Sequence, residues 1–189
     1  MPKLITVIAS TRPGRLGPAV GNWFHAFAVN HGKFDAALVD LAEVNLPILD
    51  EPMHPRLMQY QHEHTKRWSE TVSGADAFVF VTPEYNFGPP PSLLNALNYL
   101  YNEWNYKPVG FVSYGGISGG LRSVQMTKLT VTALKMVPLV EAVPIPLFAQ
   151  FIDDAGAFAA TEIHEKSAAE MLSELYRWAE ALKPLRSAA

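Results

Sequence analysis

Three turns in this sequence bring together residue types that could bind and activate a ligand. The first combines hydroxyls, two guanidinium groups and glycine-containing turns directly before a predicted helix. The residues of interest in it are Ser10, Thr11, Arg12, Arg15, Leu16, Gly17 and Pro18. The first N–H groups of a helix carry partial positive charge, so this turn is typical of a phosphate site. The alternative is a solvated surface turn with two incidental arginines.

The second turn, from Thr82 to Pro91, holds a carboxylate, an amide and two aromatic rings on a loop that prolines stiffen. Its candidate ligand-binding residues are Pro83, Glu84, Tyr85, Asn86 and Phe87. Rigid aromatic side chains with a few fixed polar groups suit a planar heteroaromatic ligand. The alternative is a proline-rich connector whose aromatic rings fill the edge of the core.

The third turn, from Ser113 to Gly120, is rich in glycine. Its candidate residues are Ser113, Tyr114, Gly115 and Gly116. Glycines let a backbone approach a ligand closely, although a flexible surface turn has the same composition. No G-x-G-x-x-G dinucleotide motif occurs, and the glycine spacing here lacks the Lys-Ser/Thr of a triphosphate-binding loop. A phosphate site of this kind favours a monophosphate ligand.

Alternating apolar runs and helical patterns must position these turns. The runs predict strands over 4–9, 34–41, 77–82, 109–113 and 139–145. The helical patterns predict a helix from Pro18 and others over 57–73, 92–102, 120–135 and 162–183. This alternation favours a flavodoxin-like α/β three-layer sandwich, with a five-stranded parallel sheet of order 2-1-3-4-5 and helices on both faces. The three turns would then follow three neighbouring strands at their carboxyl ends, where such sheets bind ligands.

Composition excludes several other classes of protein. The 189 residues, 49% of them hydrophobic and 17% charged, predict a single domain over 1–189 and exclude a disordered chain. A net charge of −3 argues against nonspecific nucleic-acid binding, and no segment reads as a signal peptide or membrane span. The absence of cysteine excludes disulfides and thiolate metal sites and fits a cytoplasmic location. The charge is uneven, because residues 1–34 carry four bases and no acid.

Together the three turns resemble the NADPH-dependent FMN reductase family of flavodoxin-like proteins, which includes quinone, azo-dye and chromate reductases. The resemblance covers about residues 3–140 and rests on STRPGRLG, on PEYN with its proline run and LLNALN, and on KPVGFVSYGG with ISGGLRS. It implies that Ser10, Arg12, Arg15 and the backbone through Pro18 hold the FMN phosphate. By the same likeness Pro83, Glu84, Tyr85 and Asn86 border the isoalloxazine ring, and 113–116 meets its pyrimidine side.

Three segments depart from the family pattern. The chain has Ala9-Ser10 where the family has Gly-Ser, and Gly17-Pro18 where it usually has a serine near the helix start. Leu94 and Asn98 replace a lysine and an acid, a change that bears on substrate preference and on subunit contacts. The resemblance also implies a homodimer or homotetramer. The aromatic run Tyr99, Leu100, Tyr101 and Trp104 is a candidate for its interface.

The implied activity is transfer of hydride from NADPH or NADH to bound FMN, and then to a quinone, free flavin, azo compound or similar acceptor, in a ping-pong cycle. Backbone N–H groups around Gly115 and Gly116 would stabilise the negative charge that develops on the ring. No side-chain acid or base is required, so no catalytic residue is predicted. Glu84 is expected to orient or support the site, because a charged carboxylate beside the ring would oppose reduction.

Two other functions fit parts of the sequence. A flavodoxin-type electron carrier would bind FMN without turnover, although the arginines and the small net charge argue against it. A serine hydrolase would use Ser118, which lies in a G-x-S-x-G match, with Asp153 or Asp154 and with His164. The His62-Glu63-His64 motif is interpreted as a solvated helix face, because side chains two residues apart on a helix diverge. No metal site is predicted.

Overall fold

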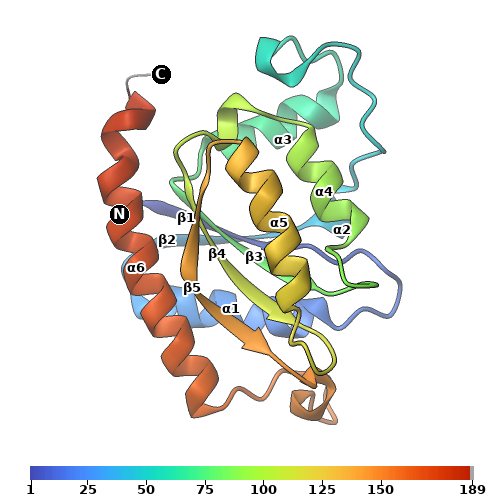
Figure 1. The fold of residues 1–189 in the computed structure, drawn as a ribbon, viewed down its shortest axis with the longest axis vertical. Coiled ribbons are helices and arrows are strands. Elements are labelled where there is room, and N and C mark those ends of the chain that lie inside the picture. The colour runs from blue at the N-terminus through green and yellow to red at the C-terminus, as the bar shows by residue number, and fades with distance from the viewer. Residues whose placement is uncertain (188–189) are drawn as a thin grey trace.

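The computed structural model describes residues 1–187 and consists of a parallel sheet between two layers of helices (Figure 1). The sheet has five strands in the order β2-β1-β3-β4-β5. They are β1 (Lys3–Ile8), β2 (Asp35–Asp40), β3 (Ala77–Pro83), β4 (Pro108–Tyr114) and β5 (Val137–Ile145). The predicted flavodoxin-like class and strand order are confirmed.

Two hydrophobic cores fill the spaces between the sheet and the helices on either face. The helices are α1 (Gly17–His31), α2 (Leu41–Val44), α3 (Glu63–Ser73), α4 (Pro91–Asn98), α5 (Leu121–Ala133) and α6 (Glu162–Ser187), with short 3₁₀ turns η1 (Pro55–Leu57), η2 (Asn102–Trp104) and η3 (Phe148–Phe151). Helices α1 and α6 cover one face, and α3, α4 and α5 the other. Successive strand residues alternate between the faces, so Phe78 and Phe80 enter one core while Val79 and Val81 enter the other. Because the core side chains fix both faces, the strand ends are held rigidly at one edge of the sheet.

Two helix boundaries differ from the sequence-based expectation. The helix expected over 57–73 begins at Glu63, because Met58 adopts a left-handed φ of 52° and the chain runs extended into His62. The helix expected over 92–102 ends at Asn98, after which the chain turns into η2. Both errors lie where tertiary contacts outweigh local helical preference.

The aromatic run after α4 is core rather than surface. Tyr99, Leu100 and Trp104 are at most 1% exposed, and the Trp104 ring lies in edge-to-face contact with Trp68 and Phe78. The expectation that these three residues form part of a subunit interface is therefore wrong. Only Tyr101 is partly exposed, and the Arg56 guanidinium lies 4.2 Å from its ring centroid.

Strand β5 forms one edge of the sheet and is irregular. Val109 pairs with Pro138 whereas Phe111 pairs with Ala142, so the register shifts between these two pairs. Val140 lies within the shifted segment and is 87% exposed. Among the described residues, none of the helices is both long enough and apolar enough to cross a membrane.

Candidate functional site

The structure brings the three turns together around one small pocket at the carboxyl edge of the sheet. Its volume is about 120 Å³, and its lining comes from all three turns and from η3. The lining residues are Arg12, Arg15, Leu16, Pro83, Glu84, Tyr85, Tyr114, Gly115 and Phe148. Of these, only Phe148 was missed by the sequence analysis, because the η3 segment carries no motif of its own. Four larger hollows, of about 670, 660, 390 and 260 Å³, have other linings.

Several predicted residues lie outside this lining. Thr11 faces the 660 Å³ hollow, which it shares with Leu94 and Asn98, the two departures from the family pattern. Asn86 and Phe87 lie on an exposed turn beside the pocket. The remaining five do not line the pocket: Ser10, Gly17 and Ser113 are buried, Pro18 is half-buried and Gly116 is exposed.

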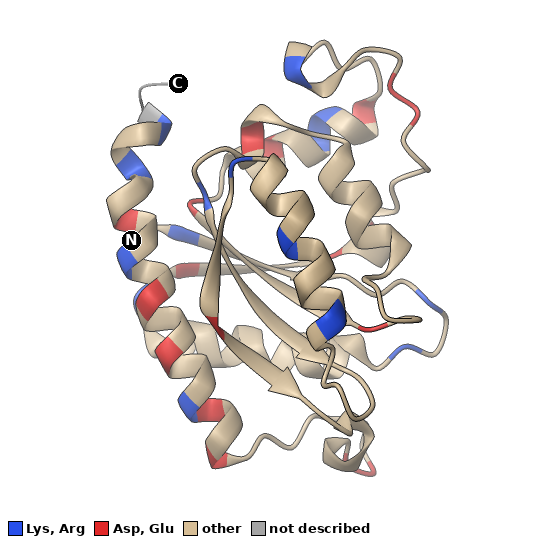
Figure 2. Ribbon diagram, in the orientation of Figure 1, with Lys and Arg blue, Asp and Glu red and all other residues tan. Residues whose placement is uncertain are grey.

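The two arginines of the first turn have different roles. Arg15 pairs in a bidentate manner with Asp40, at 2.9 Å and 2.7 Å, and its Nη1 also donates to the Ser10 carbonyl at 2.9 Å. Asp40 ends β2 opposite Ile8, so the β1–β2 register delivers this partner. Arg12 forms no side-chain hydrogen bond or ion pair with any residue that the structure describes, and its side chain is exposed. Arg15 therefore braces the turn, while Arg12 is available to an anion. Figure 2 shows the blue of Lys and Arg on this loop between β1 and α1.

The N-terminus of α1 carries no side-chain cap. The side chain of the residue before it, Leu16, has no hydrogen-bonding group, although the Leu16 carbonyl accepts the Ala19 N–H at 3.1 Å, and the first turn of the helix contains no acid. Uncapped N–H groups and the helix dipole favour a negatively charged ligand at this position. The expected start of the helix at Pro18 is confirmed to within one residue, since Gly17 is the first helical residue.

Gly17 packs closely against two hydroxyl groups, those of Ser10 and Tyr114. A Cβ atom on Gly17 would lie 2.2 Å from Ser10 Oγ and 2.5 Å from the Tyr114 hydroxyl, so only glycine fits there without a shift. Ser10 is fully buried, and its Oγ has no hydrogen-bond partner. Burial raises the pKa of Tyr114 to about 12, so that its hydroxyl remains protonated at neutral pH. The helix start thus lies beside two hydroxyls, and the hydroxyl of Ser10 is buried without a hydrogen-bond partner.

The second turn forms a tight two-residue reversal. The Tyr85 N–H donates to the Gly88 carbonyl and the Gly88 N–H to the Tyr85 carbonyl, each at 2.9 Å. Asn86 and Phe87, between them, both have left-handed φ values, of 49° and 70°. This conformation is unfavourable for a bulky residue such as Phe87. The Phe87 ring is 64% exposed, and the Arg122 guanidinium lies 3.8 Å from its centroid.

Glu84 links the second turn to the third. Its carboxylate accepts hydrogen bonds from Ser118 Oγ at 2.8 Å, from the Arg122 N–H at 3.1 Å and from Arg122 Nε at 2.6 Å. Burial of Glu84 opposes its ionisation, but the hydrogen bonds and charge from Arg122 and Ser118 prevail and lower the pKa of that carboxyl. The sequence analysis missed Arg122, because a partner 38 positions away leaves no local signal.

Some backbone N–H and C=O groups of the third turn already form hydrogen bonds within the protein. Ser113 Oγ donates to the Gly119 carbonyl at 2.7 Å and so braces the turn from within. The Gly115 N–H makes a long hydrogen bond of 3.4 Å to the Ile145 carbonyl. Within residues 1–187, the Gly116 N–H has no hydrogen-bond partner. The N–H groups of Gly115 and Gly116 are both expected to face a ligand, and only the Gly116 N–H is without a hydrogen-bond partner among the described residues.

The structure contradicts the serine hydrolase alternative. The Ser118 hydroxyl donates to Glu84, not to a histidine. The His164 ring lies against Phe151 and Phe158 and receives the Thr161 N–H on its Nδ1. Asp153 accepts the Ala157 N–H instead of orienting a histidine. These side chains form no Ser–His–Asp arrangement.

The two histidines of the His-Glu-His motif are closer than expected. Their rings stack with centroids 5.2 Å apart, because His62 is the residue before α3 and has an extended backbone. The expectation that these side chains diverge is therefore wrong. His64 Nε2 lies 3.0 Å from Asp50. Across the described part of the chain, no group of three or more His, Asp or Glu side chains is placed to hold a metal ion.

Residues 2–150 match the family model for NADPH-dependent FMN reductase. The chain belongs to this family. The NAD(P)H-dependent FMN reductase of Schizosaccharomyces pombe is 40% identical over 148 residues, which cover 77% of this chain and 74% of that relative. A quinone reductase of Pseudomonas putida is 31% identical over 98 residues, covering 49% of this chain and 51% of that protein. The chain is accordingly an oxidoreductase of a family that uses FMN and NAD(P)H.

Structural comparison agrees on the fold. The flavoenzyme NAD(P)H:(acceptor) oxidoreductase FerB from Paracoccus denitrificans superposes with a TM-score of 0.75 at 20% identity, covering 96% of this chain and 98% of that one. The likeness shows the shared flavodoxin-like fold.

The residues present fit the FMN of this reductase family. The phosphate of FMN is an anion of the kind that the uncapped start of α1 and the unpaired Arg12 favour. A phosphate oxygen would also satisfy Ser10 Oγ, the buried hydroxyl that lacks a partner. The lack of a side chain on Gly17 preserves the space that this contact needs.

Proposed function

We propose that this reductase binds FMN across its three turns and reduces a quinone, free flavin, azo compound or similar acceptor in a ping-pong cycle. The observation that carries the proposal is the convergence of the three turns on one pocket beside the uncapped start of α1. Bound FMN would accept a hydride from NADPH or NADH and pass the electrons to the acceptor, so that both substrates use one site in turn.

The chain's own residues would hold and orient the cofactor. Arg12, Ser10 Oγ and the first N–H groups of α1 would bind the phosphate, with Arg15 held by Asp40 as a brace. The Gly116 N–H would donate a hydrogen bond to the pyrimidine side of the ring. The full set of proposed cofactor-binding residues is Ser10, Thr11, Arg12, Arg15, Leu16, Gly17, Pro18, Pro83, Glu84, Tyr85, Asn86, Phe87, Ser113, Tyr114, Gly115 and Gly116.

Assembly and location belong to the same proposal. A homodimer or homotetramer follows from family likeness, and a cytoplasmic location fits a chain without cysteine. We also propose that residues 1–189 form one domain, because one sheet and its two cores run through the described chain. Sedimentation of the purified protein as a monomer at micromolar concentration would contradict the assembly.

A visible absorption spectrum combined with stopped-flow reduction tests the function. Purified protein is expected to carry flavin absorption bands or to gain them when FMN is added, and NADPH or NADH is expected to bleach them. The preferred nucleotide is the one that reduces the flavin faster. Colourless protein that takes up no FMN would refute the proposal. Protein that binds FMN but oxidises neither nucleotide in the presence of a quinone or free flavin would instead be an electron carrier.

A further inference from the structure

Glu84 places a negative charge in the wall of the proposed flavin site. Its side chain is 7% exposed and lines the same pocket as Tyr114 and Gly115. Reduction adds negative charge to a bound flavin, and a fixed carboxylate nearby opposes that addition. An unpaired Glu84 would therefore make the cofactor harder to reduce.

Arg122 is positioned to cancel that charge. Its backbone N–H and its Nε both donate to Glu84, and its Nη2 forms an ion pair with the same carboxylate. The Arg122 Cζ atom lies 3.8 Å from the centroid of the exposed Phe87 ring, so the cation contacts both this ring and the Glu84 carboxylate. Arg122 comes from the first turn of α5 and Glu84 from the loop after β3, so the pair joins two elements of the site.

The other cations of the site do not take this role. Arg15 is occupied by Asp40 and by the Ser10 carbonyl. Arg12 lines the pocket but forms no ion pair with Glu84. Within the described residues, Arg122 supplies the only ion pair to this carboxylate.

We propose that Arg122 is a positioning residue that neutralises Glu84 and thereby sets the reduction potential of FMN bound in the site. The inference rests on the proposed function, because it needs FMN beside Glu84. The lowered pKa of Glu84 supports it, since the carboxyl is ionised at neutral pH and its charge needs a partner.

The test compares Arg122→Gln, Glu84→Gln and the double variant Glu84→Gln/Arg122→Gln by spectroelectrochemical titration of bound FMN at pH 8, where an unpaired Glu84 stays ionised. Arg122→Gln is expected to weaken binding of reduced FMN at least tenfold more than binding of oxidised FMN. For a two-electron couple, a tenfold difference corresponds to a fall of about 30 mV in midpoint potential. The double variant is expected to return to within a few-fold of the wild-type ratio, because both charges are gone.

Two further variants separate charge from folding. Arg122→Lys keeps the charge but loses the fork geometry, so it is expected to keep a near wild-type potential even if FMN binds less tightly. Arg177→Gln removes an exposed arginine from an Arg–Glu pair on α6, away from the site, and is expected to leave the potential unchanged. If Arg122→Gln fails to fold, Glu84→Gln still tests the charge, because it leaves the Arg122 cation unpaired and is expected to raise the potential; an unchanged potential would refute the inference.

The outcomes separate this inference from the proposed function. Wild-type protein that binds no FMN would refute the proposed function and the inference with it. Wild-type protein that binds FMN, with a potential that Arg122→Gln does not change, would refute the inference alone. A double variant with a potential as low as that of Arg122→Gln would refute it equally, because charge cancellation would then not be the cause.

Discussion

At the scale of single residues, the site depends on the absence of a side chain at position 17 as well as on the side chains around it. Gly17 leaves room for Ser10 Oγ and the Tyr114 hydroxyl, and a methyl group there would overlap both. Arg12 and Arg15, alike in sequence, differ because Asp40 occupies one of them. Small differences in local packing thus decide which groups remain free for a ligand.

Substitution Gly17→Ala is expected to weaken FMN binding at least tenfold and to destabilise the protein by about 1–3 kcal/mol, the usual cost of overpacking. The physical reason is the contact of 2.2 Å that the new Cβ would make with Ser10 Oγ. Fluorescence titration with FMN and urea unfolding measure the two effects. Gly116→Ala serves as the control for stability, since nothing lies within 4 Å of its added Cβ. Equal stability of the two variants would contradict the packing argument.

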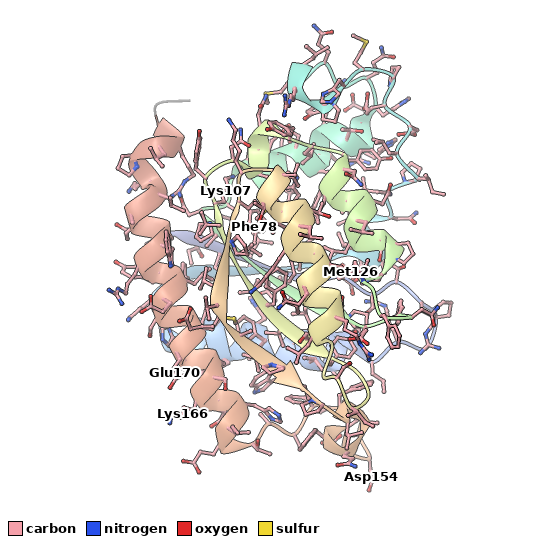
Figure 3. The ribbon with its side chains drawn as sticks, viewed as in Figure 1. Phe78, Lys107, Met126, Asp154, Lys166 and Glu170 are labelled. Carbon is pink, nitrogen blue, oxygen red and sulfur yellow. The ribbon has the colours of Figure 1, made fainter. Side chains whose placement is uncertain are left out.

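Lys107 is a buried cation at the opposite edge of the sheet, and Figure 3 shows it beside Phe78. Its Nζ donates to the Val72 carbonyl at 2.7 Å and to the Ser73 carbonyl at 3.1 Å, and lies 5.9 Å from the Phe78 ring centroid. Burial lowers the pKa of Lys107 to about 8. An unfolded lysine keeps its proton to about pH 10.4, so the unfolded state binds more protons between these values.

Stability is therefore expected to rise with pH above 8, by roughly 1.5 kcal/mol between pH 8 and 9.5 from this group alone. Urea unfolding across that range measures the slope. Lys107→Met should remove the rise, whatever its effect on stability at pH 7. The range stops below pH 10 because Tyr99 and Tyr114, with pKa values raised by burial to about 12, act in the opposite direction above it. A variant with the wild-type slope would rule out Lys107 as its source.

At the scale of elements, the start of α1 is left uncapped where an anion is proposed to bind. A capping residue would stabilise the helix of the free protein but would compete with the ligand for the same N–H groups. Helix α5 acts differently, because its first turn supplies Arg122 to Glu84. Two helices thus contribute to the site through their first turns, one by its free N–H groups and one by a charged side chain.

Replacing Leu16 tests this competition. Leu16→Asp is expected to stabilise the protein without FMN by about 0.5–1 kcal/mol, because the carboxylate caps α1. It is also expected to weaken FMN binding at least tenfold, because the carboxylate repels the phosphate. Leu16→Asn removes the same apolar contact and offers a neutral cap, so it is the matched control. Thermal unfolding without FMN and FMN titration check both. Similar FMN affinities for the two variants would indicate that no anion binds at this helix end.

The sequence was sufficient to predict elements whose signal is local. Buried strands such as β3 are continuous apolar runs, and the rule that ligands lie at strand ends placed the three turns at one edge. The sequence was not sufficient where contacts between distant residues determine which side chains pair or become buried. The Arg15–Asp40 pair depends on the β1–β2 register, and the Glu84–Arg122 pair joins positions 38 apart. Burial of Tyr99 was missed for the same reason, since a sequence does not say which aromatic rings the core takes up.

At the scale of the whole molecule, one sheet edge carries the proposed reaction, and both substrates would approach the FMN held there in turn. Initial rates at several fixed acceptor concentrations are expected to give parallel lines in double-reciprocal plots against NADPH. Lines that intersect would show that nucleotide and acceptor bind together, which contradicts a shared site. Product inhibition by NADP⁺ that is competitive with the acceptor would support the shared site independently.

The irregular edge of the sheet at β5 limits how copies of this chain can join. A strand from a neighbouring molecule extends a sheet only along an unbroken row of outward N–H and C=O groups. Pro138 and Pro144 lack an N–H, and the shifted segment around Val140 breaks the row between them. Ribbon-like growth by strand addition at this edge is therefore blocked.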